Sequence, residues 1–144
     1  MNKIFGMLIL ALISSLCLAD DTSANLTIRI GGLLNDRGQV VAYLFREGDD
    51  VMKIQNSYLH TQVKINDKKA QLFFQNIKYG KYAVTAFHDE NGNGKLDHNF
   101  LHMPAEPLGF SNNFKLGIFS GLPNFEKLQF VFGPGTDVID ITVY

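Results

Sequence analysis

The sequence predicts an all-β protein, an antiparallel β-sandwich of about seven strands of the transthyretin or immunoglobulin type, with one long ordered loop. Short segments in which apolar and polar residues alternate recur between turn-forming residues, which is the pattern of half-buried strands. After residue 20, no segment has the apolar period of a long amphipathic helix. A small closed barrel is the alternative architecture.

The first two strands are expected on either side of a turn. In residues 26–30 every second residue is Leu or Ile, which predicts a half-buried strand. Residues 35–38, Asn-Asp-Arg-Gly, are typical of a turn. Residues 40–45 form a short apolar run rich in β-branched and aromatic side chains, which indicates a strand covered on both faces. We therefore expect these two strands to form a hairpin.

The remaining strands are expected in five short segments that show the same alternation or an aromatic-rich run, namely residues 59–65, 72–77, 82–87, 128–132 and 139–143. Residues 88–125 lack any long apolar period, and a loop of this length in a small domain usually has a function. We expect its phenylalanines to pin the loop to the sandwich rather than to form a recognition surface. They are Phe100, Phe110, Phe114, Phe119 and Phe125.

Residues 1–19 are predicted to be a cleavable signal peptide before a single domain of residues 20–144. Lys3 supplies a positive start, and the apolar stretch that follows is shorter than the roughly 20 residues of a membrane span. The alternatives are an uncleaved anchor and acylation of Cys17, which Leu16 disfavours. We expect an extracytoplasmic protein, periplasmic or secreted, without a stable membrane anchor after cleavage.

The net charge and the cysteine content exclude one class of partner and any disulfide. Loss of Lys3 with the leader reduces the 13 Lys and Arg residues to 12 against 14 Asp and Glu residues, a net charge of −2. That balance argues against nucleic acid as a partner. Cys17 is the only cysteine, so the mature domain has no disulfide. The expected partner is a protein or a small ligand whose identity the sequence does not specify.

Residues 88–97, His-Asp-Glu-Asn-Gly-Asn-Gly-Lys-Leu-Asp, have the donor spacing of a calcium loop. Gly94 stands where such a loop turns sharply, and Leu96 is expected to pack inward. Calcium is a hard cation that prefers six to eight oxygen ligands, so the pattern predicts calcium as the cofactor. The predicted ligands are the side chains of Asp89, Asn91, Asn93 and Asp97 and the backbone carbonyl of Lys95.

The loop differs from an EF-hand. Phe100 stands where an EF-hand has its bidentate glutamate, and no helix is expected on either side. The loop is instead similar to shorter Asp-rich loops on β scaffolds, and two carboxylates predict modest affinity. Glu106 or a water is expected to complete the shell. The alternative is that Asp, Asn and Gly only form turns here.

Three histidines give a second metal hypothesis. His88, His98 and His102 lie close in sequence, and imidazole is a common ligand of copper and zinc. His98 and His102 would lie on one side of a helix, but a helix is not expected there because the segment contains Pro104 and Pro107 and shows no helical period. This argues against a metal site formed by the three histidines. Residues 109–113 contain a serine but lack the second glycine of a nucleophile elbow, and we expect no enzymatic activity.

The run from Tyr79 to Asn113, with the Asp-Asn-Gly loop at its centre, resembles a family of small exported bacterial proteins, the domain of unknown function DUF2141. The resemblance covers nearly the whole mature chain and is carried by residues 80–84, 88–97, 99–101, 104–106 and 109–113. It implies an extracytoplasmic β-sandwich without an established activity. It also implies that Glu106 and the trio Ser111, Asn112 and Asn113 share one surface with the calcium loop. His88 falls on the family pattern and is expected on the same surface, whereas His98 and His102 do not fall on the pattern.

The leading hypothesis is therefore a non-enzymatic binding module whose long loop is ordered by calcium. A copper or zinc protein that uses the loop histidines, either as a carrier or as a metalloenzyme, is the first alternative. A purely structural accessory of the cell envelope is the second.

Overall fold

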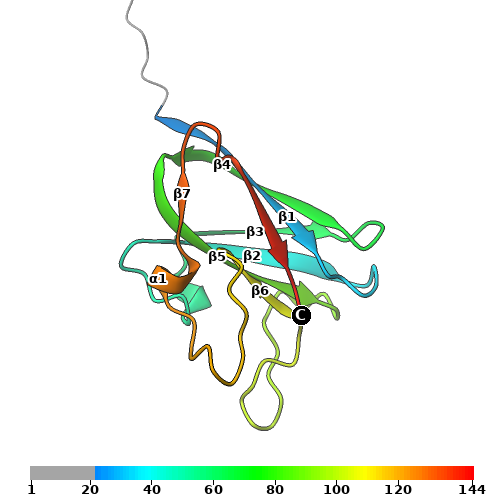
Figure 1. Ribbon diagram of the computed structural model, residues 1–144. Helices are drawn as coiled ribbons and strands as arrows, with labels where there is room; N and C mark the ends of the chain where they lie inside the picture. Colours follow the sequence, from blue (N-terminus) through cyan, green and yellow to red (C-terminus); the bar gives the residue numbers. More distant parts are fainter. Residues whose placement is uncertain (1–21) are drawn as a thin grey trace, which may run out of the picture.

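The computed structural model describes residues 22–144, so the predicted signal peptide, residues 1–19, lies outside the described part of the chain. Two β-sheets pack face to face, which confirms the predicted all-β sandwich (Figure 1). The strands of the described residues are β1 (Ser23–Gly31), β2 (Gln39–Arg46), β3 (Leu59–Lys64), β4 (Ala70–Lys78), β5 (Gly80–Asp89), β6 (Leu108–Phe110), β7 (Phe130–Phe132) and β8 (Val138–Thr142). Two single helical turns accompany them, η1 (Ile54–Asn56) and α1 (Phe125–Leu128). Among the helices of residues 22–144, none is long and apolar enough to span a membrane.

Strand order departs from the expected pairing in two places. One sheet has the order β4-β1-β8, and the other has the order β3-β2-β5-β6, with β7 paired to the start of β5. The predicted hairpin of β1 and β2 is wrong, because residues 32–38 carry the chain from one sheet to the other. Within the described residues, the strand pairs are antiparallel except β1 with β8, which are parallel. The strand that precedes β8 in the chain, β7, lies in the other sheet, so no tight turn forces β8 to run antiparallel to β1.

The central strands of the larger sheet, β2 and β5, are buried on both faces. In β2, Val40, Ala42 and Leu44 face the smaller sheet, while Tyr43 and Phe45 belong to a second apolar cluster on the outer face. This arrangement confirms that the apolar run of residues 40–45 is a strand covered on both sides. The outer cluster is completed by residues of the long loop and of α1, so this loop is the cover of a hydrophobic core.

Three of the five loop phenylalanines pin the loop to this outer face. Phe110 and Phe125 are buried, and Phe114 packs edge-on against Phe110 with ring centroids 5.5 Å apart. Phe100 and Phe119 are 89% and 100% exposed, so the expectation of pinning fails for these two. Apolar contacts thus fix the base of the loop and leave its tips in water.

The end of the chain joins the two sheets at one edge. Leu108, the first residue of β6, donates its N–H to the carbonyl of Tyr144 and accepts the N–H of Tyr144 at 3.0 Å. A side chain at Gly109 would meet the backbone of Thr142 at 2.7 Å, so glycine is needed for this close approach. The pairing places the C-terminal residue at the base of the long loop (Figure 1).

Gly38 occupies a second close approach, between the 32–38 connection and the end of β5. Its φ is +69°, and a Cβ atom would lie 1.9 Å from the backbone oxygen of Asp89. Gly135 has a similar φ of +82°, but nothing lies within 4 Å of its Cβ position. The two glycines therefore differ in steric contact and not in backbone conformation.

We predict that Gly38→Ala lowers the free energy of unfolding by about 3 kcal/mol or more, because a clash with backbone is added to the positive φ. Gly135→Ala, the matched control, should cost about 1 kcal/mol from its positive φ alone. Urea unfolding followed by circular dichroism measures both. Equal losses in the two variants would contradict the close approach.

Candidate functional site

Asp89 ends β5 and organises the turn that follows. Its side chain is buried, and its Oδ1 accepts the backbone N–H groups of Gly92 at 2.8 Å and Asn93 at 3.1 Å. Its Oδ2 accepts the N–H of Gly94 at 2.7 Å and the side-chain amide of Gln39 at 2.7 Å. One carboxylate thus fixes three consecutive amides of the loop and connects them to β2.

These contacts set the charge state of the carboxylate. Burial acts to raise the pKa of Asp89, but the hydrogen bonds from Gln39 and from the loop amides together hold its pKa below the ordinary value. Asp89 is therefore ionised in the folded protein at neutral pH. Its negative charge lies at the start of the predicted calcium loop and against three of the loop's backbone amides.

Three further predicted ligands come together beside Asp89. The side-chain nitrogen of Asn91 lies 2.6 Å from Oδ2 of Asp97, and that of Asn93 lies 3.1 Å from the same oxygen. The amide oxygen of Asn91 accepts the N–H of Asn93, and the amide oxygen of Asn93 accepts the N–H of Lys95. The loop therefore groups Asn91, Asn93 and Asp97 around one point and places the Asp97 carboxylate against two amide nitrogens.

Glu106 approaches the same loop from the chain segment before β6. Its Oε2 accepts the backbone N–H of Asp97 at 3.1 Å, while its Oε1 is buried without a hydrogen-bond partner among residues 22–144. Burial raises the pKa of Glu106, and the nearby charges of Asp89 and Asp97 raise it further. The structure thus brings Glu106 to the loop, as its expected part in the shell requires.

Leu96 packs against the outer apolar cluster, as expected from its position in the loop. The loop is held from the other side by Glu90, whose carboxylate forms a salt bridge with Arg37 and accepts the side-chain amide of Asn35 at 3.2 Å. The turn of residues 35–38 therefore holds the start of the loop through Glu90. The sequence did not predict these contacts or the hydrogen bond from Gln39 to Asp89, because both depend on the β2–β5 register, in which Gln39 lies opposite Asp89.

Ser111 is not a surface residue, which corrects its expected place. Its side chain is buried, and its hydroxyl accepts the N–H of Val84 at 2.8 Å and donates to the carbonyl of Leu128 at 2.6 Å. Asn112 donates its side-chain amide to the carbonyl of Lys127 at 3.0 Å. These contacts tie the end of β6 to β5 and to α1.

The trio of residues 111–113 is also remote from the calcium loop. At about 3.4 Å per residue, Val84 lies about 17 Å from Asp89 along β5. Asn112 and Asn113 are exposed and both adopt positive φ, of 57° and 54°, so they form a tight turn. The surface implied by the family resemblance is therefore divided, with Glu106 at the loop and residues 111–113 at mid-strand.

His88 is buried as well, which corrects its expected place on the surface. Its Nε2 lies 2.8 Å from the carbonyl oxygen of Arg37 and is therefore the protonated nitrogen. His98 and His102 are exposed in the loop. Among residues 22–144, no group of three or more His, Cys, Asp or Glu side chains is arranged to hold a metal, so the three-histidine site receives no support.

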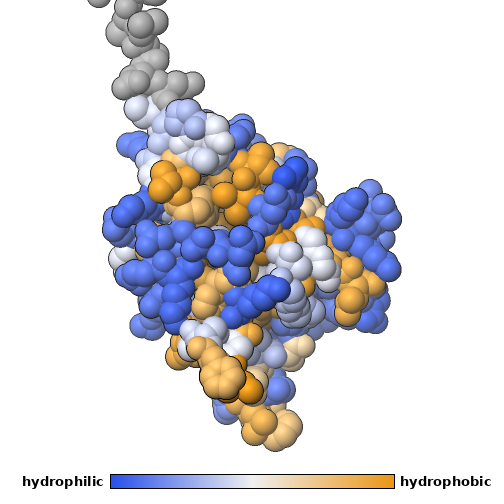
Figure 2. Space-filling view, viewed as in Figure 1, coloured by the Kyte–Doolittle hydropathy of each residue, from blue (hydrophilic) through white to orange (hydrophobic). Residues whose placement is uncertain are grey.

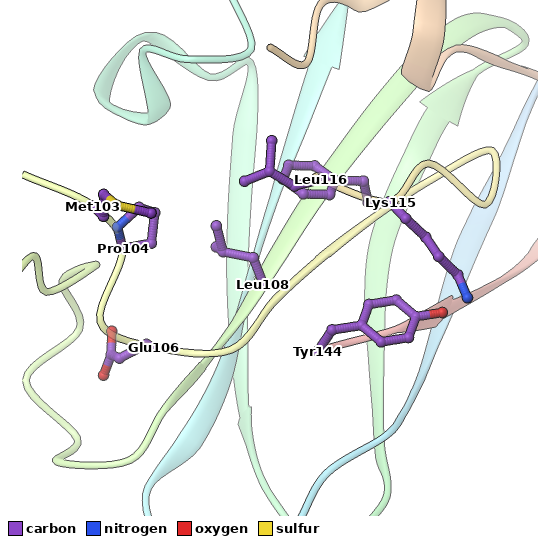
Figure 3. Close-up of a pocket in the computed structure, with 8 residues that line it drawn as sticks. Met103, Pro104, Glu106, Leu108, Lys115, Leu116 and Tyr144 are labelled. Atoms are coloured by element: carbon purple, nitrogen blue, oxygen red, sulfur yellow. The ribbon is translucent and has the colours of Figure 1, made fainter. Parts of the chain in front are cut away.

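A concave surface adjoins the loop on the side of β6. A cleft of about 400 Å³ is lined by Glu106, Leu108, Lys115 and Tyr144 together with apolar neighbours (Figure 3). The ammonium group of Lys115 lies 4.6 Å from the ring centre of Tyr144. A larger cavity of about 630 Å³ shares the wall formed by Leu108 and its neighbours. Sequence reasoning did not find either cavity.

These features define a small all-β sandwich protein with a polar Asp-Asn-Gly loop at the end of an interior strand. The chain belongs to the DUF2141 family, described as "Uncharacterized protein conserved in bacteria", whose family model matches residues 28–140. This match confirms the resemblance drawn from the loop motif. Neither a curated protein nor a solved structure matches the chain.

We predict that Asp89→Asn lowers stability at neutral pH by about 2 kcal/mol in chelator, because the charge that the loop amides stabilise is lost. Because the pKa of Asp89 is lower in the folded protein than in the unfolded chain, the ionised carboxylate stabilises the fold at pH values above the unfolded pKa of about 3.9. This stabilisation is lost as the pH falls through the pKa of Asp89 in the folded protein. Urea unfolding across acidic and neutral pH should therefore show the two proteins converging below about pH 4. A constant difference at all pH values would contradict this role. The control Asp137→Asn, at an exposed residue just before β8, should change stability by less than about 0.5 kcal/mol.

Proposed function

We propose that the protein is an exported, non-enzymatic binding module whose long loop is ordered by calcium. The observation that carries the proposal is the convergence of the Asn91, Asn93 and Asp97 side chains beside a turn already shaped by Asp89. Export rests on the predicted leader of residues 1–19 and places the protein in the periplasm or outside the cell.

Asp89 supports the proposal because it preforms the loop. A cation site costs less to form when its backbone is already turned toward the ion. The hydrogen bonds of Asp89 to three loop amides supply that arrangement before any ion binds. The conformational entropy of ordering the loop is then a cost of folding rather than of binding.

Glu106 supports the proposal through charge. It lies close enough to Asp89 and Asp97 for both to raise its pKa, and one of its oxygens is buried without a protein partner in the described chain. Three acidic groups in one region repel one another, and a divalent cation removes that repulsion. Because no three acidic groups of residues 22–144 form a metal cluster by themselves, the proposed site also uses amide and carbonyl oxygens and water.

A non-enzymatic role fits the state of Ser111, the serine considered as a nucleophile. Its hydroxyl is buried and is used in hydrogen bonds to backbone on both sides. A catalytic nucleophile needs access to its substrate and a base within reach. Ser111 instead holds the loop to β5, so its hydroxyl is not available to attack a substrate.

Calcium is predicted to raise the melting temperature relative to chelator. Free calcium about a hundredfold above Kd adds about 2.7 kcal/mol, which corresponds to roughly 10 °C for a domain of this size. Magnesium should give a smaller rise, because it requires a stricter octahedral geometry. Thermal unfolding followed by circular dichroism measures all three conditions.

The double variant Asp97→Asn and Glu106→Gln should lose most of the calcium response while keeping the fold, because Asp89 is left intact. Asp137→Asn removes one exposed carboxylate elsewhere and should keep the full response. No rise in the natural protein, or an undiminished rise in the double variant, would sink the proposal.

A further inference from the structure

The larger cavity lies between the outer face of the five-stranded sheet and the long loop. Its floor is formed by Thr85 of β5 and by Leu108 and Phe110 of β6. Its walls come from residues 51–54 and from the two arms of the loop, residues 96–104 and 116–123. These arms project at the same end of the molecule, and the tip there is mainly hydrophobic (Figures 1 and 2).

Several apolar side chains in these walls are left in water. Ile118 is 94% exposed, Leu122 is 69% exposed and Met103 is 58% exposed, and all three line the cavity. A molecule of suitable size would remove this surface from water, which is the main driving force for binding to an apolar site. A volume of about 630 Å³ lies within the range of small-molecule sites.

The floor of the cavity holds a polar group that has no partner. Thr85 is 5% exposed, and its hydroxyl oxygen forms no hydrogen bond to any described residue. A buried hydroxyl without a partner is unfavourable, and such groups are rare in folded proteins. Thr85 lines the cavity, so a ligand there can supply the missing hydrogen bond.

The residues that line the cavity indicate the chemical class of the ligand. Valine, leucine, isoleucine and methionine predominate, Phe110 is the aromatic residue, and within the described chain no Lys, Arg, Asp or Glu lines the cavity. An ionised group would be buried there without a counter-charge, so the ligand is neutral. Flexible aliphatic walls fit an aliphatic chain better than a flat ring system.

We infer that this cavity binds a neutral, mainly aliphatic molecule with one hydroxyl or carbonyl group, which exchanges a hydrogen bond with the hydroxyl of Thr85. The inference names the ligand class for the binding function proposed above and rests on that function, but it does not depend on calcium. His98 and His102, at the exposed mouth, are the other polar residues of the lining.

Binding is tested with 1-octanol and with 1-chlorooctane, which has the same chain but no donor. Both should displace the neutral fluorophore N-phenyl-1-naphthylamine from the natural protein. In Thr85→Val, which keeps the shape and removes the hydroxyl, affinity for 1-octanol should fall about fivefold and affinity for 1-chlorooctane should stay the same. Equal changes for the two molecules, or no displacement by 1-octanol, would overturn the inference.

A measurement of thermal stability distinguishes a hydroxyl of Thr85 that binds a ligand from one that stabilises the fold. Thr85→Val should melt at a higher temperature than the natural protein without ligand, since an unpartnered buried hydroxyl is removed. A lower melting temperature would show that the hydroxyl has a partner inside the protein and would overturn the inference.

The location is tested with a matched pair of half-exposed apolar residues. Leu116 lines the cavity and is 48% exposed, while Phe73 lies on β4 and is 51% exposed. Leu116→Glu should abolish 1-octanol binding, and Phe73→Glu should leave it unchanged. Equal loss in both variants, or no loss in either, would overturn the assignment to this cavity.

Each titration is run in calcium and in chelator, which separates the two proposals. Binding of 1-octanol in chelator supports the cavity even if calcium has no effect on melting. A calcium-dependent rise in melting temperature without 1-octanol binding overturns the cavity and leaves the calcium loop standing.

Discussion

The buried carboxylate of Asp89 is the constraint on which the loop end of the molecule depends. A charge in the interior is tolerated only when hydrogen bonds compensate the water it has lost. Asp89 obtains them from three successive loop amides and from Gln39 of the neighbouring strand. This single requirement fixes where β5 ends, how the Asp-Asn-Gly turn runs and how that turn is joined to the sheet.

The second constraint is that the central strands of the larger sheet have two apolar faces. One face packs on the smaller sheet, and the other needs a cover that no third sheet of residues 22–144 provides. The chain meets this need with the long loop, whose base is pinned by Phe110 and Phe125 and by the buried hydroxyl of Ser111. Because the pinning stops short of the tips, a cavity remains beneath the loop, and apolar residues around it stay exposed.

The sequence was sufficient for most of the fold, because the period of two in each strand shows which residues face a core. It could not show which strands lie side by side, since alternation carries no information about partners. The expected pairing of β1 with β2 is therefore wrong, and β6, which follows Pro107 and contains Gly109, lacks the alternation that predicted β7. In the site, local spacing predicted that Asn91, Asn93 and Asp97 come together. The burial of Ser111 and the part of Gln39 depend on contacts between distant segments, which spacing alone cannot reveal.

The backbone pair between Leu108 and Tyr144 has a consequence for biosynthesis. A chain is made from its N-terminus, and a domain completes its fold only after all of its interacting segments have emerged. Tyr144 pairs with Leu108 at the base of the loop and follows it by 36 residues in the chain. The base of the loop can therefore reach its final form only after Tyr144 has emerged, later than every strand that the loop covers.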